Sequence, residues 1–435
     1  MKVVIAGAGF AGLKLAQKLN NEEGIEVLLI DKYNFHQFQP LFYQVATAGL
    51  DASNISFPLR KVFQNSKNVH IRLAELTEIK PAQNIVVTNI EEFKYDVLVI
   101  ATGADTNFFN NVNLAEKSFP MKSTLEALQI KYHLIKNLED ALDIKDKDEL
   151  RQRLSVVIAG GGPTGVELSG AIAEMRNNIL PRDYPEIDFS LMDIRLVEGS
   201  PRTLAAMSEK SSAQSRRYLE KLGVKVQTET HVKDYDGEKV LLQNGETIPA
   251  RTVIWAAGIK GNVPKGIEPG LIARGNRIKV DRLNRVQGFE HIYALGDVAY
   301  METPKYPNGH PQVANVALNQ GKNLARNLIR QVNGNKHYQG EFEYHDKGSL
   351  ATVGRNLAVV DFPKNRGHLG GFVAWLTWMV LHLVLILGVK NRLQIFLNWV
   401  YKYFTHDQSL RLIFQKIPKK NTVPNKEDAL VNKAV

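Results

Sequence analysis

Two glycine-rich segments carry the residues of this chain whose types and spacing are best suited to chemistry. VVIAGAGFAG occupies residues 3–12 and VVIAGGGPTGVE occupies residues 156–167, and each begins with an apolar run typical of a buried strand. In a strand–turn–helix unit of this kind, the first glycine permits the tight turn, the second lets the backbone approach a pyrophosphate, and the third lets the helix pack on the strand. These glycines are Gly7, Gly9 and Gly12 in the first segment and Gly160, Gly162 and Gly165 in the second. One such segment is weak evidence for a nucleotide, but two predict two dinucleotide sites, with the phosphates at the helix N-termini.

An acidic residue ends the strand that follows each glycine segment. Asp31 stands at this point in the first unit and Glu198 in the second. A carboxylate in this position accepts hydrogen bonds from a ribose diol and repels a 2′-phosphate. Glu198 comes late because residues 181–192 form an insertion between the helix and the strand. It predicts NADH rather than NADPH at the second site, although Arg202 close by could accommodate a 2′-phosphate.

Two further predicted strands have similar sequence patterns and follow the two glycine segments at similar separations along the chain. YDVLVIATG at residues 95–103 and RTVIWAAG at residues 251–258 are apolar runs that close on small residues. This spacing indicates an internal duplication of a nucleotide-binding unit, in which the small residues let the backbone approach the cofactor. A third strand, HIYALGD at residues 291–297, ends in Gly296 and Asp297, and this carboxylate is expected to contact a cofactor hydroxyl.

Residues 34–50, NFHQFQPLFYQVATAGL, are aromatic, rich in glutamine and poor in charge. No simple helix or strand period fits them. A few polar groups among aromatic side chains suit contact with a flat ring such as a flavin, and ordinary core packing is the alternative. His36 is interpreted as a structural histidine rather than a proton donor. The polar side chains expected to contact the ring are Gln37, Gln39, Tyr43 and Gln44.

Composition narrows the classes of function. The 435 residues are enough for two or three domains, and the absence of cysteine excludes disulfides, thiolate metal sites and enzymes that use a redox-active cysteine pair. The formal net charge is +10, and eleven Lys/Arg against three Asp/Glu place +8 of it in residues 364–435. Because the basic residues there alternate with apolar stretches, this segment suits an anionic membrane surface better than a nucleic acid. Met1 leads directly into a core strand, so no signal peptide is predicted and the catalytic body is expected in the cytoplasm.

Two apolar stretches dominate the C-terminal region. Residues 369–389 contain no ionised side chain and are long enough to span a bilayer, although His382 lies among them. Residues 393–404 are predicted to form a shorter helix with one apolar side. Spanning a membrane, lying in its interface and forming a dimer surface are all compatible with this pattern. The residues expected at a lipid interface are Trp375, Trp378, Trp399, Tyr401 and Tyr403, together with the cations Lys390, Arg392, Arg411, Lys416, Lys419 and Lys420.

Three other segments complete the expected secondary structure. Residues 120–150 are helical in pattern and highly charged, which is typical of a solvated connector or face. Residues 342–354 are strand-like. A helix is predicted from Ala314 to about Arg330, with amide side chains near one of its faces.

These features resemble the flavoproteins with two dinucleotide-binding domains, and most closely type II NADH dehydrogenase, the single-subunit NADH:quinone oxidoreductase. The segments that carry the resemblance are residues 34–50, GGGPTGVELSGAIAEM at 160–175, VIWAAGI at 253–259, YALGD at 293–297, KGSLATVGR at 347–355 and the tail at 375–400. The resemblance implies an α/β fold in which two Rossmann-like domains, the second inserted in the first, precede a C-terminal membrane-docking helical region. The expected domains are residues 1–118 with 282–335 for FAD, 119–281 for NADH, and 336–435.

The resemblance also implies roles for individual residues. Positions that match FAD contacts of the family are Gly7, Gly9, Phe10, Gly12, Asp31, Lys32, Thr102, Gly103 and Asp297, and those that match its NADH side are Gly160, Gly162, Gly165, Glu198, Ala257 and Gly258. Glu167 matches a residue near the nicotinamide and flavin rings and is the candidate catalytic group, although a glutamate in the first turn of a helix is also favoured by the helix dipole. The family often has an Ala-Gln-x-Ala-x-Gln-Gln pattern beside the quinone. Here asparagines replace the first two glutamines, so the expected quinone contacts Asn315, Asn319 and Gln320 would act at a changed distance.

The implied activity is transfer of hydride from NADH to FAD and then two-electron reduction of a membrane quinone, without proton pumping, at the cytoplasmic face of the cell membrane. No protein nucleophile or metal is needed, because the cofactor supplies the difficult chemistry. Sulfide:quinone oxidoreductases and disulfide reductases fit less well, since they need cysteines. A reductase with a protein acceptor and a membrane-docked NADH-sensing flavoprotein remain as alternatives, and a homodimer through the tail is a further expectation.

Overall fold

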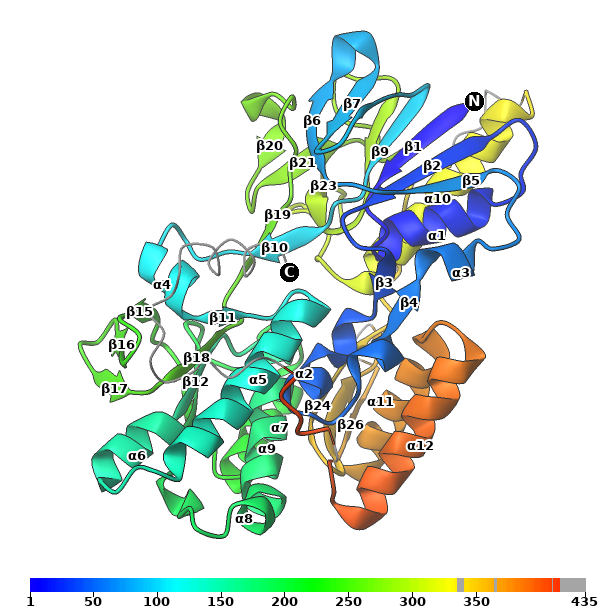
Figure 1. Ribbon diagram of the computed structural model, residues 1–435. Helices are drawn as coiled ribbons and strands as arrows, with labels where there is room; N and C mark the ends of the chain where they lie inside the picture. The colour runs from blue at the N-terminus through cyan, green and yellow to red at the C-terminus, as the bar shows by residue number, and fades with distance from the viewer. Residues whose placement is uncertain (335–339, 364–365, 409, 415–435) are drawn as a thin grey trace.

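Two five-stranded sheets organise the computed structural model, which describes residues 1–334, 340–363, 366–408 and 410–414 (Figure 1). The first sheet is parallel and has the order β22-β9-β1-β2-β5. Its strands are β1 (Lys2–Ala6), β2 (Glu26–Asp31), β5 (Val69–Leu73), β9 (Val97–Ile100) and β22 (Ile292–Ala294). Val3 is aligned with Val27 on one side and with Val97 on the other. Both faces of these strands are covered, which explains why they read as continuous apolar runs.

Two helices from opposite ends of the nucleotide-binding region cover one face of this sheet. α1 (Phe10–Leu19) follows the first glycine turn, and α10 (Ala314–Val332) packs beside it. Leu15 of α1 and Leu324 of α10 are fully buried in the same cluster as Val3. The other face is covered by two small sheets, β6 (Leu76–Lys80), β7 (Ile85–Thr88) and β8 (Glu92–Lys94), and β20 (Ile272–Ala273), β21 (Arg277–Val280) and β23 (Ala299–Met301).

The second sheet repeats the pattern with the order β11-β18-β12-β13-β14. Its strands are β11 (Phe119–Pro120), β12 (Val156–Ala159), β13 (Ile194–Val197), β14 (Lys225–Gln227) and β18 (Thr252–Trp255). The helices α5 (Thr124–Ala141), α6 (Lys147–Leu154), α7 (Pro163–Asn178), α8 (Leu180–Asp183) and α9 (Glu209–Lys221) accompany it, as does the three-stranded sheet of β15 (Val232–Tyr235), β16 (Lys239–Leu242) and β17 (Thr247–Pro249). Two Rossmann-like units are therefore present, as the internal duplication predicted.

The chain crosses between the two units through a pair of short strands. β10 (Ala104–Thr106) leaves the first unit and pairs antiparallel with β19 (Ile259–Gly261), which returns to it. Beyond β19, Ile267 and Ile278 pack in the same cluster as Val4 and Leu28 of the first sheet. The return to the first unit therefore falls before Ile267, earlier than the boundary expected at residue 282.

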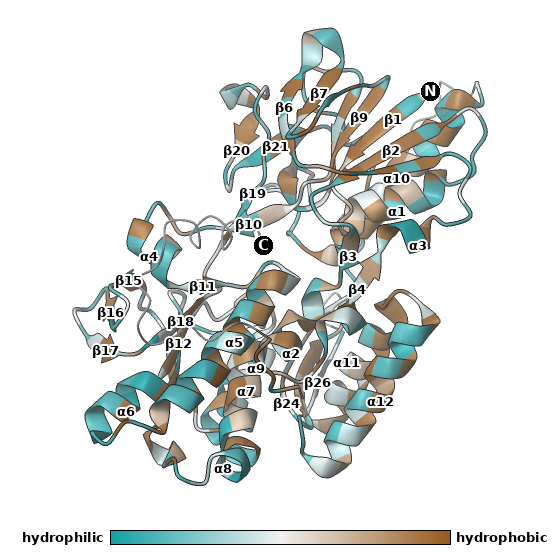
Figure 2. Cartoon of the chain, in the orientation of Figure 1, coloured by the Kyte–Doolittle hydropathy of each residue, from teal (hydrophilic) through white to brown (hydrophobic). Residues whose placement is uncertain are grey.

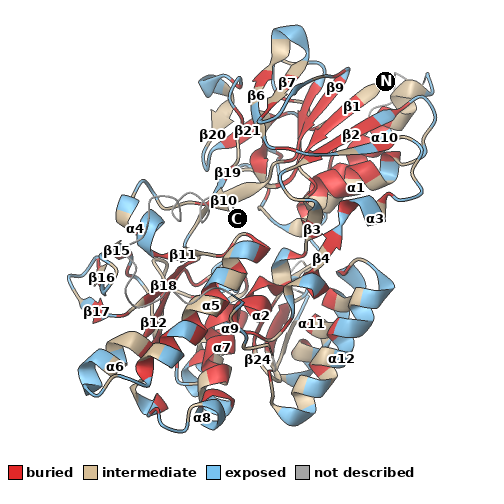
Figure 3. Cartoon of the chain, viewed as in Figure 1, coloured by how far each residue is buried: buried red, intermediate tan, exposed pale blue. Residues whose placement is uncertain are grey.

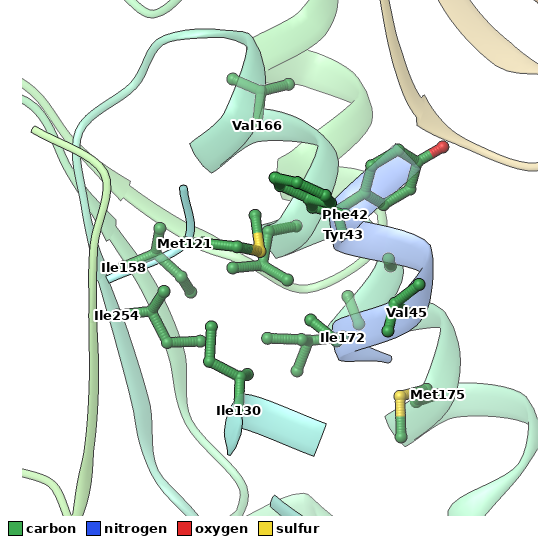
Figure 4. Packing of buried hydrophobic residues seen from close by; sticks show 14 of the residues in the cluster. Phe42, Tyr43, Val45, Met121, Ile130, Ile158, Val166, Ile172, Met175 and Ile254 are labelled. Atoms are coloured by element: carbon green, nitrogen blue, oxygen red, sulfur yellow. The ribbon is translucent and has the colours of Figure 1, made fainter. Parts of the chain in front are cut away.

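α5 is not the solvated connector that its charge suggested. Its N-terminus is closed by a capping box, in which Ser123 and Glu126 satisfy each other's backbone N–H groups. Ala127, Ile130 and further apolar residues on one side of α5 are buried against α7 and the short helix α2 (Phe42–Ala46). Figure 4 shows Ile130 beside Ile172 of α7, with Phe42 nearby. Of its charged residues, Lys136 and Glu139 are exposed, whereas Lys131 is buried.

The C-terminal region is a small sheet followed by two helices. The sheet consists of β24 (Ser349–Gly354), β25 (Leu357–Asp361) and β26 (His368–Gly370), so only the second half of the predicted strand-like segment 342–354 forms a strand. The apolar stretch 369–389 is also divided, because it starts in β26, continues as α11 (Phe372–Leu385) and turns before α12 (Val389–Thr405). Fourteen helical residues extend about 21 Å, against about 30 Å of bilayer hydrocarbon. Within the described part of the chain, no helix is both long and apolar enough to cross a membrane.

Short elements complete the described chain. They are β3 (Phe35–Gln37) paired with β4 (Ser56–Pro58), the helices α3 (Leu59–Val62) and α4 (Val112–Lys117), and single 3-10 turns including Gly296–Val298. The imidazole of His36 is buried at the start of this region, with Nδ1 2.8 Å from the carbonyl oxygen of Ala8. This contact confirms the structural role expected for His36.

Candidate functional site

A cavity of about 1280 Å³ lies between the two Rossmann-like units and is lined by both glycine turns. Nearly all residues predicted from the sequence to contact FAD or NADH line this one cavity. They are Gly7, Gly9, Phe10, Asp31, Lys32, Gln39, Thr102, Gly103, Gly296 and Asp297 from the first unit, and Gly160, Gly162, Glu167, Glu198, Ala257 and Gly258 from the second. Gly12 and Gly165 lie behind the turns, where a Cβ atom would approach the carbonyl oxygens of Gly7 and Gly160 to 1.8 Å. Their role is the close packing of helix on turn.

The glycine turns fit phosphate groups. Gly7 and Gly160 have the same left-handed φ of +108°, and a Cβ atom at either would lie within 2.4 Å of a backbone oxygen from the neighbouring strand loop. At Gly9 and Gly162 no described residue beyond the chain neighbours lies within 4 Å of such a Cβ, so these positions are open toward the cavity. A pyrophosphate can therefore approach the backbone at Gly9 and Gly162 and meet the N-terminal N–H groups of α1 and α7.

Two carboxylates are held at the turns by backbone N–H groups. Asp31 accepts hydrogen bonds from the N–H of Ala8 at 2.5 Å and of Tyr33 at 2.7 Å. Burial raises the pKa of Asp31, and these N–H donors oppose the rise. Glu198 accepts from the N–H of Gly161 at 2.5 Å and from that of Ser200 at 2.7 Å. Each carboxylate keeps unused acceptor positions, which suits it to bind a ribose diol.

Arg202 does not line the cavity. Its Nη2 donates to the carbonyl oxygen of Ala205 at 3.2 Å, while Glu198 stands at the cavity wall. This arrangement favours the prediction of NADH over NADPH, since a 2′-phosphate would meet the carboxylate first.

A second cavity, of about 260 Å³, lies between α7 and the C-terminal region. Its wall is built from α2, α7, β24, α11 and α12, and it includes Tyr43, Gln44, Glu167, Thr352, Trp378 and Trp399. Residues 34–50 are therefore divided between two sites, because Gln37 and Gln39 line the large cavity while Tyr43 and Gln44 line this one. The sequence did not reveal the second cavity, since its residues come from segments far apart in the chain.

Glu167 is the residue that lines both cavities. The backbone N–H of Thr352 is 3.4 Å from its Oε1, and the indole N–H of Trp378 faces the carboxyl without a hydrogen bond of ordinary geometry. Burial raises the pKa of Glu167 to about 8, and the two N–H groups oppose this rise only in part. The group is thus a neutral carboxylic acid at pH 7, placed where a proton could pass between the two spaces.

His382 also lines the large cavity, a position that the sequence did not indicate. Its Nδ1 lies 2.7 Å from the carbonyl oxygen of Trp378, and the two rings stack at 4.0 Å. Burial lowers the pKa of His382 to about 4, so the imidazole is neutral at pH 7. From the sequence, the apolar stretch around His382 is expected to contact lipid.

Two predicted interface aromatics are buried instead. Trp378 and Trp399 are 2% and 6% exposed and form part of the wall of the second cavity. α11 is apolar all round, so its periodicity could not show which side faces the protein. Arg411, predicted to meet lipid headgroups, pairs with Asp183 and Asp407. Lys416, Lys419 and Lys420 lie outside the described residues.

The three amides predicted to contact quinone line neither cavity. Gln320 is buried, and its Oε1 accepts a hydrogen bond at 2.7 Å from the N–H of Gly296. Asn319 donates to the backbone oxygen of Asn315 at 2.8 Å and to its side-chain oxygen at 2.9 Å. Gln320 thus holds the turn at Gly296, and the two asparagines bond to each other.

Comparison with known proteins places this architecture in a class. Residues 1–321 match the family described as pyridine nucleotide-disulphide oxidoreductase, and residues 346–406 match the NDH2 C-terminal domain. The chain belongs to the pyridine nucleotide-disulphide oxidoreductase family, the class of flavoproteins with two dinucleotide-binding units.

Full-length similarity narrows this class. The chain is 32% identical over 421 residues to the type II NADH:quinone oxidoreductase Ndh of Mycobacterium tuberculosis, covering 93% of this chain and 88% of that protein. It is 28% identical over 372 residues to the type II NADH:quinone oxidoreductase of Staphylococcus aureus, covering 82% and 89%. Within its class the chain therefore belongs to the type II NADH:quinone oxidoreductases. The structure of NDH2 from Plasmodium falciparum in complex with NADH has the same fold, with a TM-score of 0.86 at 22% identity over 93% of this chain and 98% of that one.

Proposed function

We propose that this chain oxidises NADH and reduces a membrane quinone by two electrons, with FAD as the carrier between them and without proton pumping. FAD and NADH are the cofactors of the large cavity, whose two glycine turns and two acidic strand ends suit one dinucleotide each. The quinone head group occupies the 260 Å³ cavity. The observation that carries this proposal is Glu167, which lines both cavities and is a neutral acid at pH 7.

The contribution of the chain's own residues follows from their positions. The turns at Gly9 and Gly162 bind the pyrophosphates, and Asp31 and Glu198 bind the ribose hydroxyls. Reduction of a quinone to a quinol needs two protons besides two electrons, and Glu167 is placed to supply one of them. The flavin, when bound, supplies hydride and electron transfer. Asn315, Asn319 and Gln320 are not assigned to the quinone in this proposal.

The membrane contact is proposed at α11 and α12. These helices lie at the outer side of the C-terminal region, and much of the surface of α12 is exposed (Figures 1 and 3). Figure 2 shows apolar segments along α12 between polar ones. The exposed apolar residues of the two helices include Phe372, Val380, Val384, Leu393, Phe396, Leu397 and Phe404. Such a surface, with Lys390 beside it, fits monotopic docking at the cytoplasmic face of the membrane, and a homodimer through the same surface stays a prediction.

Stopped-flow absorbance of the purified flavoprotein tests the reaction. Mixing with NADH is expected to bleach the flavin rapidly, mixing with NADPH to bleach it slowly, and a soluble quinone to restore the absorbance of the reduced protein. Flavin that NADH reduces but quinone does not reoxidise would instead support a protein acceptor or an NADH sensor. Rapid steady-state turnover with quinone would support the enzyme over a protein acceptor or an NADH sensor.

A further inference from the structure

Tyr43 and Gln44, on α2, bring a buried polar pair to the wall of the second cavity. Their side chains are 6% and 8% exposed. The indole Nε1 of Trp399 donates to Gln44 Oε1 at 2.8 Å, and Gln44 Nε2 donates to the Tyr43 hydroxyl, also at 2.8 Å. One chain of buried hydrogen bonds thus connects the proposed docking helix α12 to a tyrosine at the cavity.

The indole fixes the direction of this chain. An indole nitrogen can only donate, so the Gln44 atom that faces Trp399 must be the amide oxygen. The amide nitrogen therefore faces Tyr43, and because this nitrogen also only donates, the phenol oxygen must accept. The hydroxyl hydrogen of Tyr43 is left over, and no residue in the described ranges accepts it.

The surroundings of this hydrogen favour a ligand. A buried donor without an acceptor costs free energy, which a ligand oxygen in the cavity would recover. Figure 4 shows the hydroxyl of Tyr43 pointing away from the neighbouring aliphatic side chains. Burial and the nearby Glu167 raise the pKa of Tyr43, so the phenol keeps its hydrogen at pH 7. The ring of Trp378 packs against the ring of Tyr43 in a T-shaped arrangement, with the centroids 6.4 Å apart.

We infer that Tyr43 donates a hydrogen bond to a carbonyl oxygen of the quinone, and that Gln44 and Trp399 are positioning residues that aim this hydroxyl. The inference rests on the proposed function and goes beyond it by naming the group that holds the substrate. It also makes α12 part of the substrate site, since the same helix carries both Trp399 and the exposed apolar surface.

Menadione binding to the oxidised, flavin-loaded protein tests the inference without turnover. Its dissociation constant, followed by quenching of tryptophan fluorescence, is expected to rise roughly tenfold in Tyr43→Phe, as for the loss of one neutral hydrogen bond. NADH-driven flavin reduction should keep its rate. Tyr95→Phe is the matched control, because this buried hydroxyl has no hydrogen-bond partner in the described part of the chain and lies outside both cavities. Unchanged menadione affinity in Tyr43→Phe would overturn the inference.

Trp399→Phe tests the positioning role. Without the indole N–H the Gln44 amide can rotate, so menadione affinity should fall by a similar factor, and the double variant Tyr43→Phe, Trp399→Phe should lose little more. Two effects that simply multiply would show that Trp399 acts through packing and would refute its positioning role. Failure of the proposed function has a different signature, namely wild-type protein that NADH reduces and menadione does not reoxidise.

Discussion

The backbone N–H of Thr352 lies 3.4 Å from Oε1 of Glu167, although 185 positions separate the two residues in the sequence. This contact joins β24 of the C-terminal sheet to α7 of the second Rossmann-like unit. It also lies where the cofactor cavity and the proposed quinone cavity meet. This weak contact and the indole N–H of Trp378 do not offset burial, so the Glu167 carboxyl is protonated at neutral pH.

Replacing this acid should remove a proton donor. In the wild-type protein, the rate of flavin reoxidation by quinone is expected to fall as pH rises through about 8, because Glu167 then ionises. Glu167→Gln should reoxidise roughly a hundredfold more slowly at pH 7 and lose this pH dependence. Stopped-flow absorbance between pH 6 and pH 9 checks the result, with the exposed Glu186→Gln as control. If the reoxidation rate of Glu167→Gln depended on pH as in the wild type, Glu167 would not be the proton donor.

The raised pKa of Glu167 also predicts how the stability of the folded protein depends on pH. The folded-state pKa of Glu167 is raised above its unfolded value of about 4.5, so the folded protein holds this proton more tightly. This contribution to stability is fully present below pH 4.5 and is lost as pH rises through about 8. The free energy of unfolding of Glu167→Gln, measured by urea titration, should therefore decline less between pH 5 and pH 8 than that of the wild type. If the free energy of unfolding declined equally in the two proteins, the raised pKa of Glu167 would be contradicted.

The cofactor cavity could be predicted from the sequence because its residues are defined by local spacing. A strand, a tight turn and a helix fix where Gly9 and Asp31 must lie relative to each other, and the same holds for Gly162 and Glu198. Both pairs reach the same cavity in the structure.

The second cavity could not be predicted in this way. Tyr43, Glu167, Thr352 and Trp378 come from four elements, and only tertiary packing brings them together. The uniform apolar character of α11 hides the inward side that carries Trp378. The prediction that residues 120–150 form a solvated connector or face was wrong for a related reason. The many charged residues of α5 made its buried apolar side, which includes Ile130, difficult to recognise from the sequence.

The glycine turns allow folding and cofactor binding to be separated. At Gly9 a methyl group would have no atom of the described residues within 4 Å, apart from those of its own chain neighbours. Gly9→Ala should therefore fold but lose flavin, because the methyl occupies the space of the pyrophosphate. Gly162→Ala should keep its flavin and bind NADH at least tenfold more weakly. Gly7→Ala is the contrasting variant, since its Cβ would lie 2.2 Å from the Ala101 oxygen at a φ of +108°, and it should lower the melting temperature. Flavin absorbance, NADH titration and thermal unfolding check the three outcomes. A Gly9→Ala protein with full flavin content would contradict this assignment of the turn.

Glu198 should set the preference for NADH. Glu198→Gln can accept from only one of the backbone N–H groups of Gly161 and Ser200, because an amide has one acceptor oxygen, and it removes the charge that repels a 2′-phosphate. The ratio of kcat/KM for NADPH to that for NADH is expected to rise roughly tenfold, in line with about 1.4 kcal/mol. Steady-state kinetics with both nucleotides measure this ratio. Should it stay constant, selectivity must come from elsewhere in the cavity.

The exposed side of α12 should bind the membrane. Leu393 and Leu397 are 56% and 54% exposed and lie one turn apart, outside both cavities. Burying each in lipid would contribute roughly 1.5 kcal/mol or more, so the double change Leu393→Glu, Leu397→Glu should weaken binding to vesicles of anionic phospholipid by at least a hundredfold. Turnover with a soluble quinone should stay at the wild-type rate. Gln394→Glu, Asn398→Glu adds the same charge to the polar side of the helix and is the control in vesicle sedimentation. If both double variants lost vesicle affinity equally, charge alone would govern binding. A loss of affinity confined to the leucine variant locates the membrane contact on this side of α12.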